Sequence, residues 1–108
     1  MPPFTAPAER HAEAVQRRRQ RRELADAVRR GELALHYQPR FCLHSDTRIG
    51  AEALIRWPHR RRGLLAPGSF LPLAEAAGLT AEIGAWVLRT ACAAAATWPS
   101  TLGVSVNV

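Results

Sequence analysis

The spacing of apolar positions changes several times along this chain of 108 residues. From Glu9 to Arg30 there is no glycine or proline, and strong helix formers dominate. An apolar stripe is clear only in the second half of this segment, around Leu24 and Val28. We therefore predict a helix over 9–30 whose polar first half frays unless another part of the chain supports it. Residues 1–8, rich in proline and alanine, are expected to form a tail.

A strand period follows the helix. Apolar and polar residues alternate over 33–38, and Pro39 is expected to end this first strand because proline cannot donate a sheet hydrogen bond. Ser45 and Asp46 then give a turn signal. The pattern thus predicts a strand, a turn and the start of a second strand.

The second strand is predicted over 49–57, where every odd position is apolar. Side chains alternate between the two faces of a strand. Glu52, Leu54 and Arg56 therefore share one face, opposite a packed apolar face. The following segment, 58–66, carries three consecutive arginines and is expected to be a solvated basic loop.

Two helices and a last strand complete the pattern. Ser69 is expected to cap a short helix that ends near Gly78, and Thr80 to cap a longer one closed by Trp98 and Pro99. The longer helix has the best apolar stripe in the sequence, formed by Ile83, Trp86, Val87, Thr90, Ala91 and Ala94. Valines then alternate with polar residues over 103–108. A strand, a helical crossover and another strand form the unit of α/β folds, so the sequence predicts an α/β protein.

Composition narrows the functional classes. Hydrophobic residues make up 47% of the chain, yet no apolar run has the ~18 residues that suggest a membrane span. The start of the chain lacks the pattern of a secretory signal, and Cys42 and Cys92 are expected to be reduced thiols. These features indicate a cytoplasmic location.

The charge leaves a second class open. The net charge is +6 and every basic residue is arginine, which is compatible with binding to nucleic acid. Much of the excess lies in one cluster over 17–22, however, and such a cluster is more often a solvated helix face. No nucleic-acid-binding motif is present, so we expect no nucleic-acid partner.

Glu52 and Asn107 are the first candidates for chemistry. Each lies on the more polar face of a predicted strand, and a carboxylate and an amide oxygen are hard ligands suited to Mg²⁺ or Mn²⁺. Arg56, on the face of Glu52, has the planar fork that binds phosphate. Spacing alone leaves an alternative open, in which the first two lie on a solvated sheet face and Arg56 forms a surface ion pair.

A family resemblance adds to this pattern. The segment Glu52-Ala53-Leu54-Ile55-Arg56-Trp57 resembles the signature of EAL domains, and several flanking motifs follow in the family's order. They include Leu35-His36-Tyr37-Gln38-Pro39, Phe70-Leu71-Pro72-Leu73-Ala74-Glu75 and Val104-Ser105-Val106-Asn107-Val108. The resemblance runs from about residue 23 to residue 108. It implies a domain organisation of a tail and arginine-rich helix or linker over 1–22, followed by the N-terminal part of an EAL domain over 23–108.

EAL domains are modified TIM (β/α)8 barrels that hydrolyse cyclic di-GMP to linear pGpG with two divalent cations. The resemblance therefore implies that Glu52 and Asn107 are metal ligands for Mg²⁺ or Mn²⁺. It implies that Gln38, Leu54 and Arg56 contact cyclic di-GMP. It also implies an upstream sensory or diguanylate cyclase domain as a possible partner.

The length sets a limit on these expectations. A TIM barrel needs ~250 residues or somewhat fewer, so the chain is expected to be an incomplete opening portion of the barrel. The family's later acidic and lysine residues have no counterpart, and we expect the chain alone to be inactive and to associate with itself through exposed sheet edges. The alternative is a degenerate, non-catalytic EAL module that binds cyclic di-GMP or a protein partner.

Overall fold

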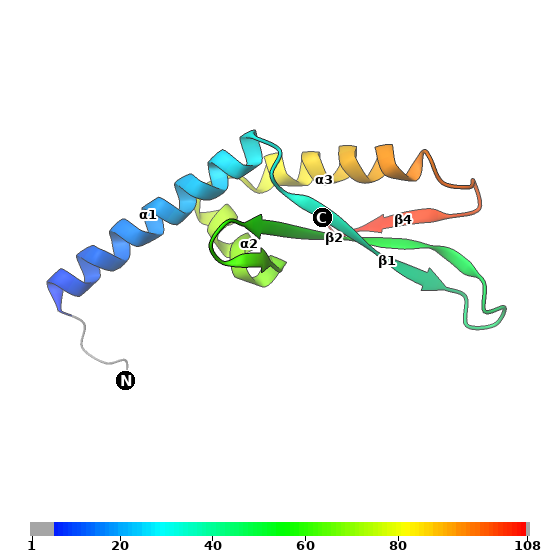
Figure 1. Ribbon diagram of the computed structural model, residues 1–108, viewed down its shortest axis with the longest axis horizontal. Coiled ribbons are helices and arrows are strands. Elements are labelled where there is room, and N and C mark those ends of the chain that lie inside the picture. Colours follow the sequence, from blue (N-terminus) through cyan, green and yellow to red (C-terminus); the bar gives the residue numbers. More distant parts are fainter. Residues whose placement is uncertain (1–5, 108) are drawn as a thin grey trace.

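A computed structural model describes residues 6–107 of the chain (Figure 1). The elements follow in the order α1 (Pro7–Arg29), β1 (Ala34–Phe41), β2 (Arg48–His59), β3 (Gly63–Leu65), α2 (Pro67–Ala76), α3 (Thr80–Ala95) and β4 (Gly103–Val106). The predicted order of helices and strands is confirmed. One strand, β3, was missed. Residues 1–5, where most of the predicted tail falls, and Val108 lie outside the described part of the chain.

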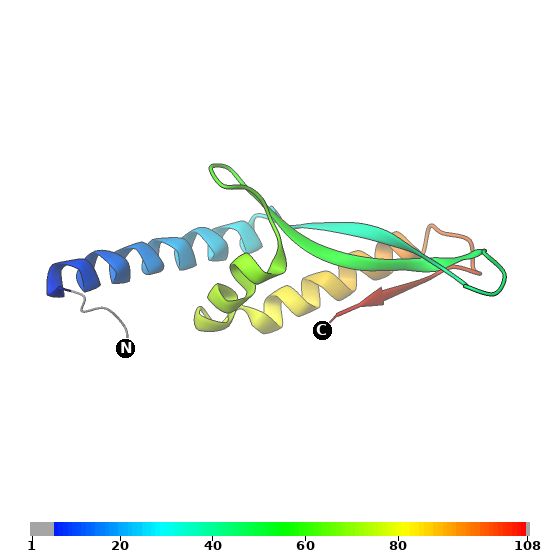
Figure 2. The ribbon, with the colours of Figure 1, turned by 90° about the horizontal axis from the view of Figure 1, so that it is seen from below.

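Helix α1 begins at Pro7, two residues before the predicted start, because proline suits the first helical position. The Glu9 carboxylate accepts a hydrogen bond from the Ala6 backbone N–H at 3.2 Å, which satisfies an amide at the helix start. Only the second half of α1 is packed, with Leu24 and Ala27 buried. The first half reaches away from the rest of the molecule and is still helical (Figures 1 and 2).

Strand β2 is the centre of the sheet. It pairs antiparallel with β1, through its first half parallel with β4 and, at its far end, antiparallel with β3. The prediction that Pro39 ends the first strand is wrong, since β1 continues to Phe41. The physical reason is position: within the described residues β1 pairs only with β2, and a proline is tolerated in an edge strand.

The predicted basic loop over 58–66 is confirmed only for 60–62, which form an exposed turn, and is wrong on either side of it. Strand β2 continues to His59, and Gly63–Leu65 folds back on it so that Leu65 pairs with Trp57 and becomes buried. Gly63 has a φ of 78°, a left-handed conformation that glycine adopts at no steric cost. Three arginines therefore lie in a tight hairpin turn, where a charge run had indicated a loop.

The two predicted helix caps are wrong. Ala66 is the N-cap of α2 and Pro67 its first residue, so Ser69 lies inside the first turn. Leu79 is the N-cap of α3, and Thr80 makes no capping hydrogen bond. Helix α3 ends at Ala95, three residues before the expected Trp98.

The apolar stripe of α3 is confirmed, because Ile83, Val87 and Ala91 are buried. The helix runs along the sheet and covers its apolar face (Figure 2). One core joins this helix, α2, the end of β2 and the packed half of α1, with the Trp57 and Phe70 rings 5.9 Å apart. The polar face of β2 is thereby left on the opposite side of the sheet. Within the described residues, no helix combines the length and apolar character that crossing a membrane requires.

Candidate functional site

Glu52 lies in the middle of the central strand β2. Its partner on β1 is Gln38, and its partner on β4 is Ser105. Paired residues of neighbouring strands point to the same face, with Cβ atoms about 5 Å apart. The sheet therefore brings a carboxylate, an amide and a hydroxyl into one row across three strands.

Leu54 and Arg56 continue the face of Glu52 along β2, as predicted from alternation. Both are half-buried, whereas Ala53 and Trp57, on the other face, are buried. The Arg56 guanidinium donates a hydrogen bond from Nη1 to the Ile55 carbonyl at 2.7 Å. Among the described residues Arg56 forms no ion pair, so the surface-ion-pair alternative is not what the structure shows.

Asn107 is not part of a strand, contrary to the prediction. Strand β4 ends at Val106, which pairs with Ala53, and Asn107 is the next residue and is exposed. The parallel pairing nevertheless carries the chain alongside the part of β2 that holds Glu52 and Leu54. Four of the five candidate residues thus lie on paired strands, and the fifth follows at the end of one.

Two polar residues of this face were not singled out from the sequence. Arg40 on β1 donates from Nη1 to the Ser105 Oγ on β4 at 3.0 Å, across the intervening β2. Arg40 lies two residues after Gln38 and therefore on the same face of β1. It was not identified because the strand was expected to end at Pro39. Ser105 lies two residues before Asn107, and the same alternation could have identified it.

Gly50 makes this arrangement possible. It lies opposite Arg40 on one side and Gly103 on the other. A Cβ at position 50 would come within 2.0 Å of the Gly103 carbonyl oxygen, so only glycine allows β2 and β4 to approach this closely.

The donor set of this face suits a hard cation. Glu52 supplies a carboxylate and Asn107 an amide oxygen, and Mg²⁺ commonly binds one or two protein ligands while keeping several waters. Within residues 6–107, no group of three or more histidine, cysteine, aspartate or glutamate side chains is placed to hold a metal ion. The donor types of Glu52 and Asn107 suit a hard cation, and residues 6–107 supply no larger cluster of metal ligands.

A second polar cluster joins α1 to the β2–β3 turn. Glu23 accepts hydrogen bonds at 2.7 Å from His59 Nε2 and at 2.7 Å from Arg61. Burial acts to raise the pKa of Glu23, but the His59 hydrogen bond and the charge of Arg61 together lower this pKa below its ordinary value. The cluster was missed because Glu23 is 36 residues from His59 and 38 residues from Arg61 in sequence.

The comparisons with known proteins decide the family. The model of the EAL domain matches residues 21–108, which is most of the chain. The chain belongs to the EAL domain family. The resemblance predicted from its motifs is therefore confirmed.

Relatives of this EAL chain are known in Pseudomonas aeruginosa. The bifunctional diguanylate cyclase/cyclic di-GMP phosphodiesterase MucR is 49% identical over 76 residues, which is 70% of this chain and 11% of MucR. The cyclic di-GMP phosphodiesterase NbdA is 44% identical over 79 residues, which is 73% of this chain and 10% of NbdA. The EAL chain thus spans about a tenth of the length of these curated relatives.

Solved EAL structures match the fold. The MucR phosphodiesterase in complex with cyclic di-GMP is 40% identical with a TM-score of 0.74, over 83% of this chain and 38% of that one. An EAL domain protein from Listeria monocytogenes is 29% identical with a TM-score of 0.70, over 80% and 34% of the two chains. The predicted α/β fold is confirmed: it is that of the TIM-barrel-like EAL domain, of which this chain covers a part.

Proposed function

We propose that this chain supplies the opening part of the cyclic di-GMP site of an EAL phosphodiesterase domain. The observation that carries the proposal is the shared polar face of β1, β2 and β4, where Gln38 pairs with Glu52 and Leu54 and Arg56 follow. A structural neighbour with 40% identity is a cyclic di-GMP complex, which supports this choice of ligand. The domain boundary is proposed to lie within α1, with 1–22 as a linker and 23–108 as EAL domain.

Each residue has a proposed role that follows from its chemistry. Glu52 and Asn107 would hold Mg²⁺ or Mn²⁺, since carboxylate and amide oxygens are hard ligands. Arg56 would bind a phosphate of cyclic di-GMP through its fork, Gln38 would hydrogen-bond the dinucleotide, and Leu54 would offer it apolar contact. Bound divalent cations would supply charge stabilisation at the scissile phosphate.

The 108 residues alone are proposed to be inactive, because one carboxylate and one amide are too few ligands for two cations. Incubation of the pure chain with Mn²⁺ and cyclic di-GMP should yield no pGpG above the rate without protein. Metal-dependent production of pGpG that co-elutes with the chain would overturn this part of the proposal. Addition of EDTA is the control, since it abolishes any turnover that needs a divalent cation.

The site assignment is tested in a completed domain. The chain is fused to the remaining part of the MucR phosphodiesterase domain, and turnover and Mn²⁺ affinity are measured. Glu52→Gln should remove most activity and weaken Mn²⁺ binding at least tenfold, because it keeps the side chain's size but deletes its charge, and Asn107→Ala should act in the same direction.

Arg56→Ala provides the contrast in the same fusion. It should mainly raise KM for cyclic di-GMP and leave Mn²⁺ affinity near normal, since it removes charge-assisted hydrogen bonds to phosphate. Normal Mn²⁺ affinity and turnover in Glu52→Gln would make Glu52 a structural strand residue. The site assignment would then fail at its central position.

A second function is supported by the small number of metal ligands among the described residues. In this alternative the chain is a non-catalytic EAL module that binds cyclic di-GMP or a protein partner. Binding of cyclic di-GMP to the chain in EDTA, weakened by Arg56→Ala and unaffected by Glu52→Gln, would favour this alternative.

The first half of α1, which reaches away from the domain, is proposed to connect to a sensory or diguanylate cyclase domain (Figure 1).

A further inference from the structure

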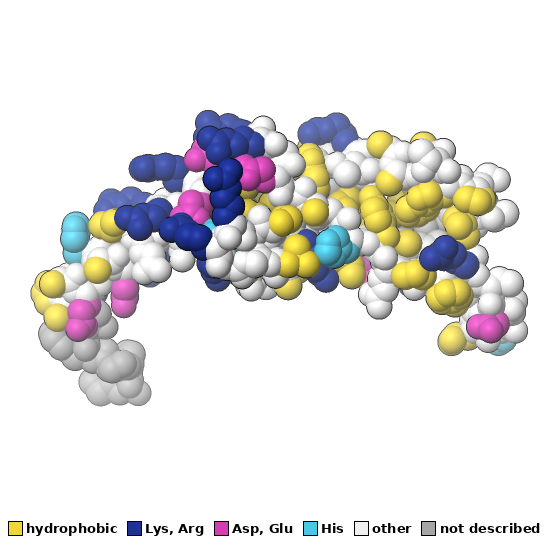
Figure 3. All heavy atoms as spheres, in the orientation of Figure 1, with side chains coloured by type: hydrophobic (Ala, Val, Ile, Leu, Met, Phe, Trp, Pro, Cys, Tyr) yellow, Lys and Arg dark blue, Asp and Glu magenta, His cyan; other side chains and the backbone are white. Residues whose placement is uncertain are grey.

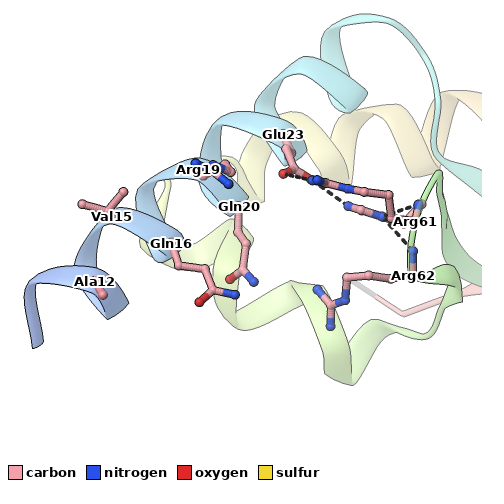
Figure 4. A pocket seen from close by; sticks show the side chains of 9 residues that line it. Ala12, Val15, Gln16, Arg19, Gln20, Glu23, Arg61 and Arg62 are labelled. Atoms are coloured by element: carbon pink, nitrogen blue, oxygen red, sulfur yellow. Dashed lines mark hydrogen bonds and ion pairs between the residues drawn. The ribbon is translucent and has the colours of Figure 1, made fainter. Parts of the chain in front are cut away.

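A cleft separates α1 from the β2–β3 turn. Its volume is about 460 Å³, within the range of ~300–1,000 Å³ typical of small-molecule sites. Helix α1 contributes Gln16, Arg19 and Gln20 to its wall, and the turn contributes Arg61 and Arg62. Gln16 and Gln20 project from the helix toward the side on which Arg62 lies (Figure 4).

The charges of this cleft are unbalanced. Among the described residues that line it, only Glu23 is acidic, and that carboxylate is already bound by His59 and Arg61 at 2.7 Å each. Among the described residues, neither Arg19 nor Arg62 forms an ion pair. Two guanidinium groups are therefore available on opposite walls, and basic side chains gather on this part of the surface (Figure 3).

His59 fixes the turn that carries two of these arginines. Its Nδ1 accepts hydrogen bonds from the backbone N–H groups of Arg61 and Arg62, each at 3.1 Å. Because Nδ1 is an acceptor, Nε2 carries the proton that is donated to Glu23. The His59 side chain is only 7% exposed, so the turn is held from inside the protein. A preorganised backbone lowers the ordering cost of binding a ligand there.

We propose that this cleft binds a small ligand with two adjacent phosphate groups. An arginine fork matches phosphate geometry, and the cleft is lined by two arginines without an ion pair among the described residues, one from α1 and one from the turn, so that each can bind one phosphate. The amides of Gln16 and Gln20 add neutral hydrogen-bond donors. The cleft is distinct from the proposed dinucleotide site, because His59 and Trp57 lie on the face of β2 opposite Glu52.

A small ligand fits this cleft better than a polynucleotide does. The arginines of the cleft come from two elements that face each other across a hollow. The other arginines over 17–22 (Arg17, Arg18, Arg21 and Arg22) form a band along one side of α1 and do not line the cleft, so a polynucleotide that followed this band would not occupy the hollow.

Inorganic pyrophosphate is the probe, titrated into the 108-residue chain at about 0.15 M salt, where exposed charges are screened beyond ~8 Å. We expect saturable binding that shifts the amide NMR signals of Arg61 and Arg62.

The double variant Arg19→Gln/Arg62→Gln should weaken this binding at least about tenfold, since both forks are lost. The matched control Arg17→Gln/Arg89→Gln removes the same charge away from the cleft and should stay within about twofold. Circular dichroism of each variant verifies that the fold is retained.

A third variant separates the fork from the charge. Arg19→Lys/Arg62→Lys keeps both charges but loses bidentate geometry, and should bind pyrophosphate several-fold more weakly than the parent chain. Equal weakening in the cleft and control variants, or the absence of saturable binding, would overturn the proposal. So would a single-stranded RNA that binds more tightly than pyrophosphate and is weakened equally by both double variants, because binding would then follow net charge alone.

Discussion

Glu23 connects α1 to the end of β2 through a single carboxylate. It accepts hydrogen bonds from His59, whose side chain is 7% exposed, and from Arg61, whose side chain is 70% exposed. An exposed ion pair contributes little, so most of the stabilisation comes from the His59 contact. These contacts bind the ionised carboxylate, and they lower the pKa of Glu23 against the opposing effect of burial.

The lowered pKa of Glu23 gives a pH-dependent stability. Its contribution is fully present above the ordinary pKa of 4.5 and is lost as the pH falls through the lower pKa of the folded state. Glu23→Gln should therefore reduce the free energy of unfolding by about 1 kcal/mol at pH 7, and this difference should shrink steadily below pH 4.5. Urea unfolding of both chains at several pH values measures it.

Glu75→Gln on α2 is the control for Glu23, since Glu75 is exposed and its carboxylate forms no ion pair with any described residue. It should change the free energy of unfolding by less than about 0.5 kcal/mol at any of these pH values. A difference between Glu23→Gln and the parent chain that stays constant down to pH 3 would show that the ionised carboxylate is not what stabilises this contact.

Single residues differ in how far the sequence could predict them. The period of two in β2 placed Glu52, Leu54 and Arg56 on one face, because a strand fixes the direction of every second side chain. No local period connects Glu23 with His59, since their contact depends on how α1 packs on the end of β2. Asn107 was placed in a strand because the alternation continues through it, whereas the pairing with β2 ends at Val106.

At the scale of elements, the pairing of β2 with β4 joins the two segments of the proposed site. It depends on Gly50, where a Cβ would meet the Gly103 carbonyl oxygen at 2.0 Å. That oxygen belongs to the backbone, so the clash is relieved only if the strands move apart. The register that sets Glu52 beside Ser105 is therefore sensitive to one methyl group.

Gly50→Ala should separate β4 from β2. We expect a loss of about 2 kcal/mol or more in the free energy of unfolding, and faster hydrogen exchange at the amides of 104–106. Gly84→Ala is the matched control: Gly84 lies within α3 with nothing within 4 Å of an added Cβ, and alanine should stabilise that helix by up to about 1 kcal/mol. If Gly50→Ala leaves exchange at 104–106 unchanged, the close approach of the two strands is not required for their pairing.

Elements were predicted more reliably than their ends. The stripe of apolar residues along α3 and the alternation of apolar and polar residues in β2 each predict that one face is buried. The structure confirms both predictions. The caps failed because Ala66 and Leu79 occupy the N-cap positions, so neither Ser69 nor Thr80 caps its helix. Strand β3 is three residues long, which is too short to show an alternation of apolar and polar residues. The three arginines before it also indicated a loop.

The whole molecule is extended for its length. Its radius of gyration is 18.0 Å, against about 13 Å for a compact domain of this size, and it measures 60 × 33 × 23 Å. Helix α1 projects from one end and the β1–β2 hairpin from the other (Figure 1). Several large apolar side chains are exposed at the hairpin, with Leu43 98%, Phe41 55% and Ile49 49% exposed.

We expect this chain to associate with itself in solution. Among the described residues both β1 and β4 have one unpaired edge, and exposed strand edges next to apolar side chains favour pairing with another copy. Sedimentation velocity at tens of micromolar should therefore show species heavier than the 11.9 kDa monomer, and their fraction should increase with protein concentration.

The double variant Phe41→Gln/Leu43→Gln should shift the distribution toward monomer, because it removes the apolar side chains beside the free edge of β1. Val15→Gln/Leu88→Gln, which removes two exposed apolar side chains on helices, should shift it less. A monomer at all concentrations, with a single cooperative unfolding transition, would show instead that these strand edges do not mediate self-association. Residues 6–107 would then form a unit that folds on its own.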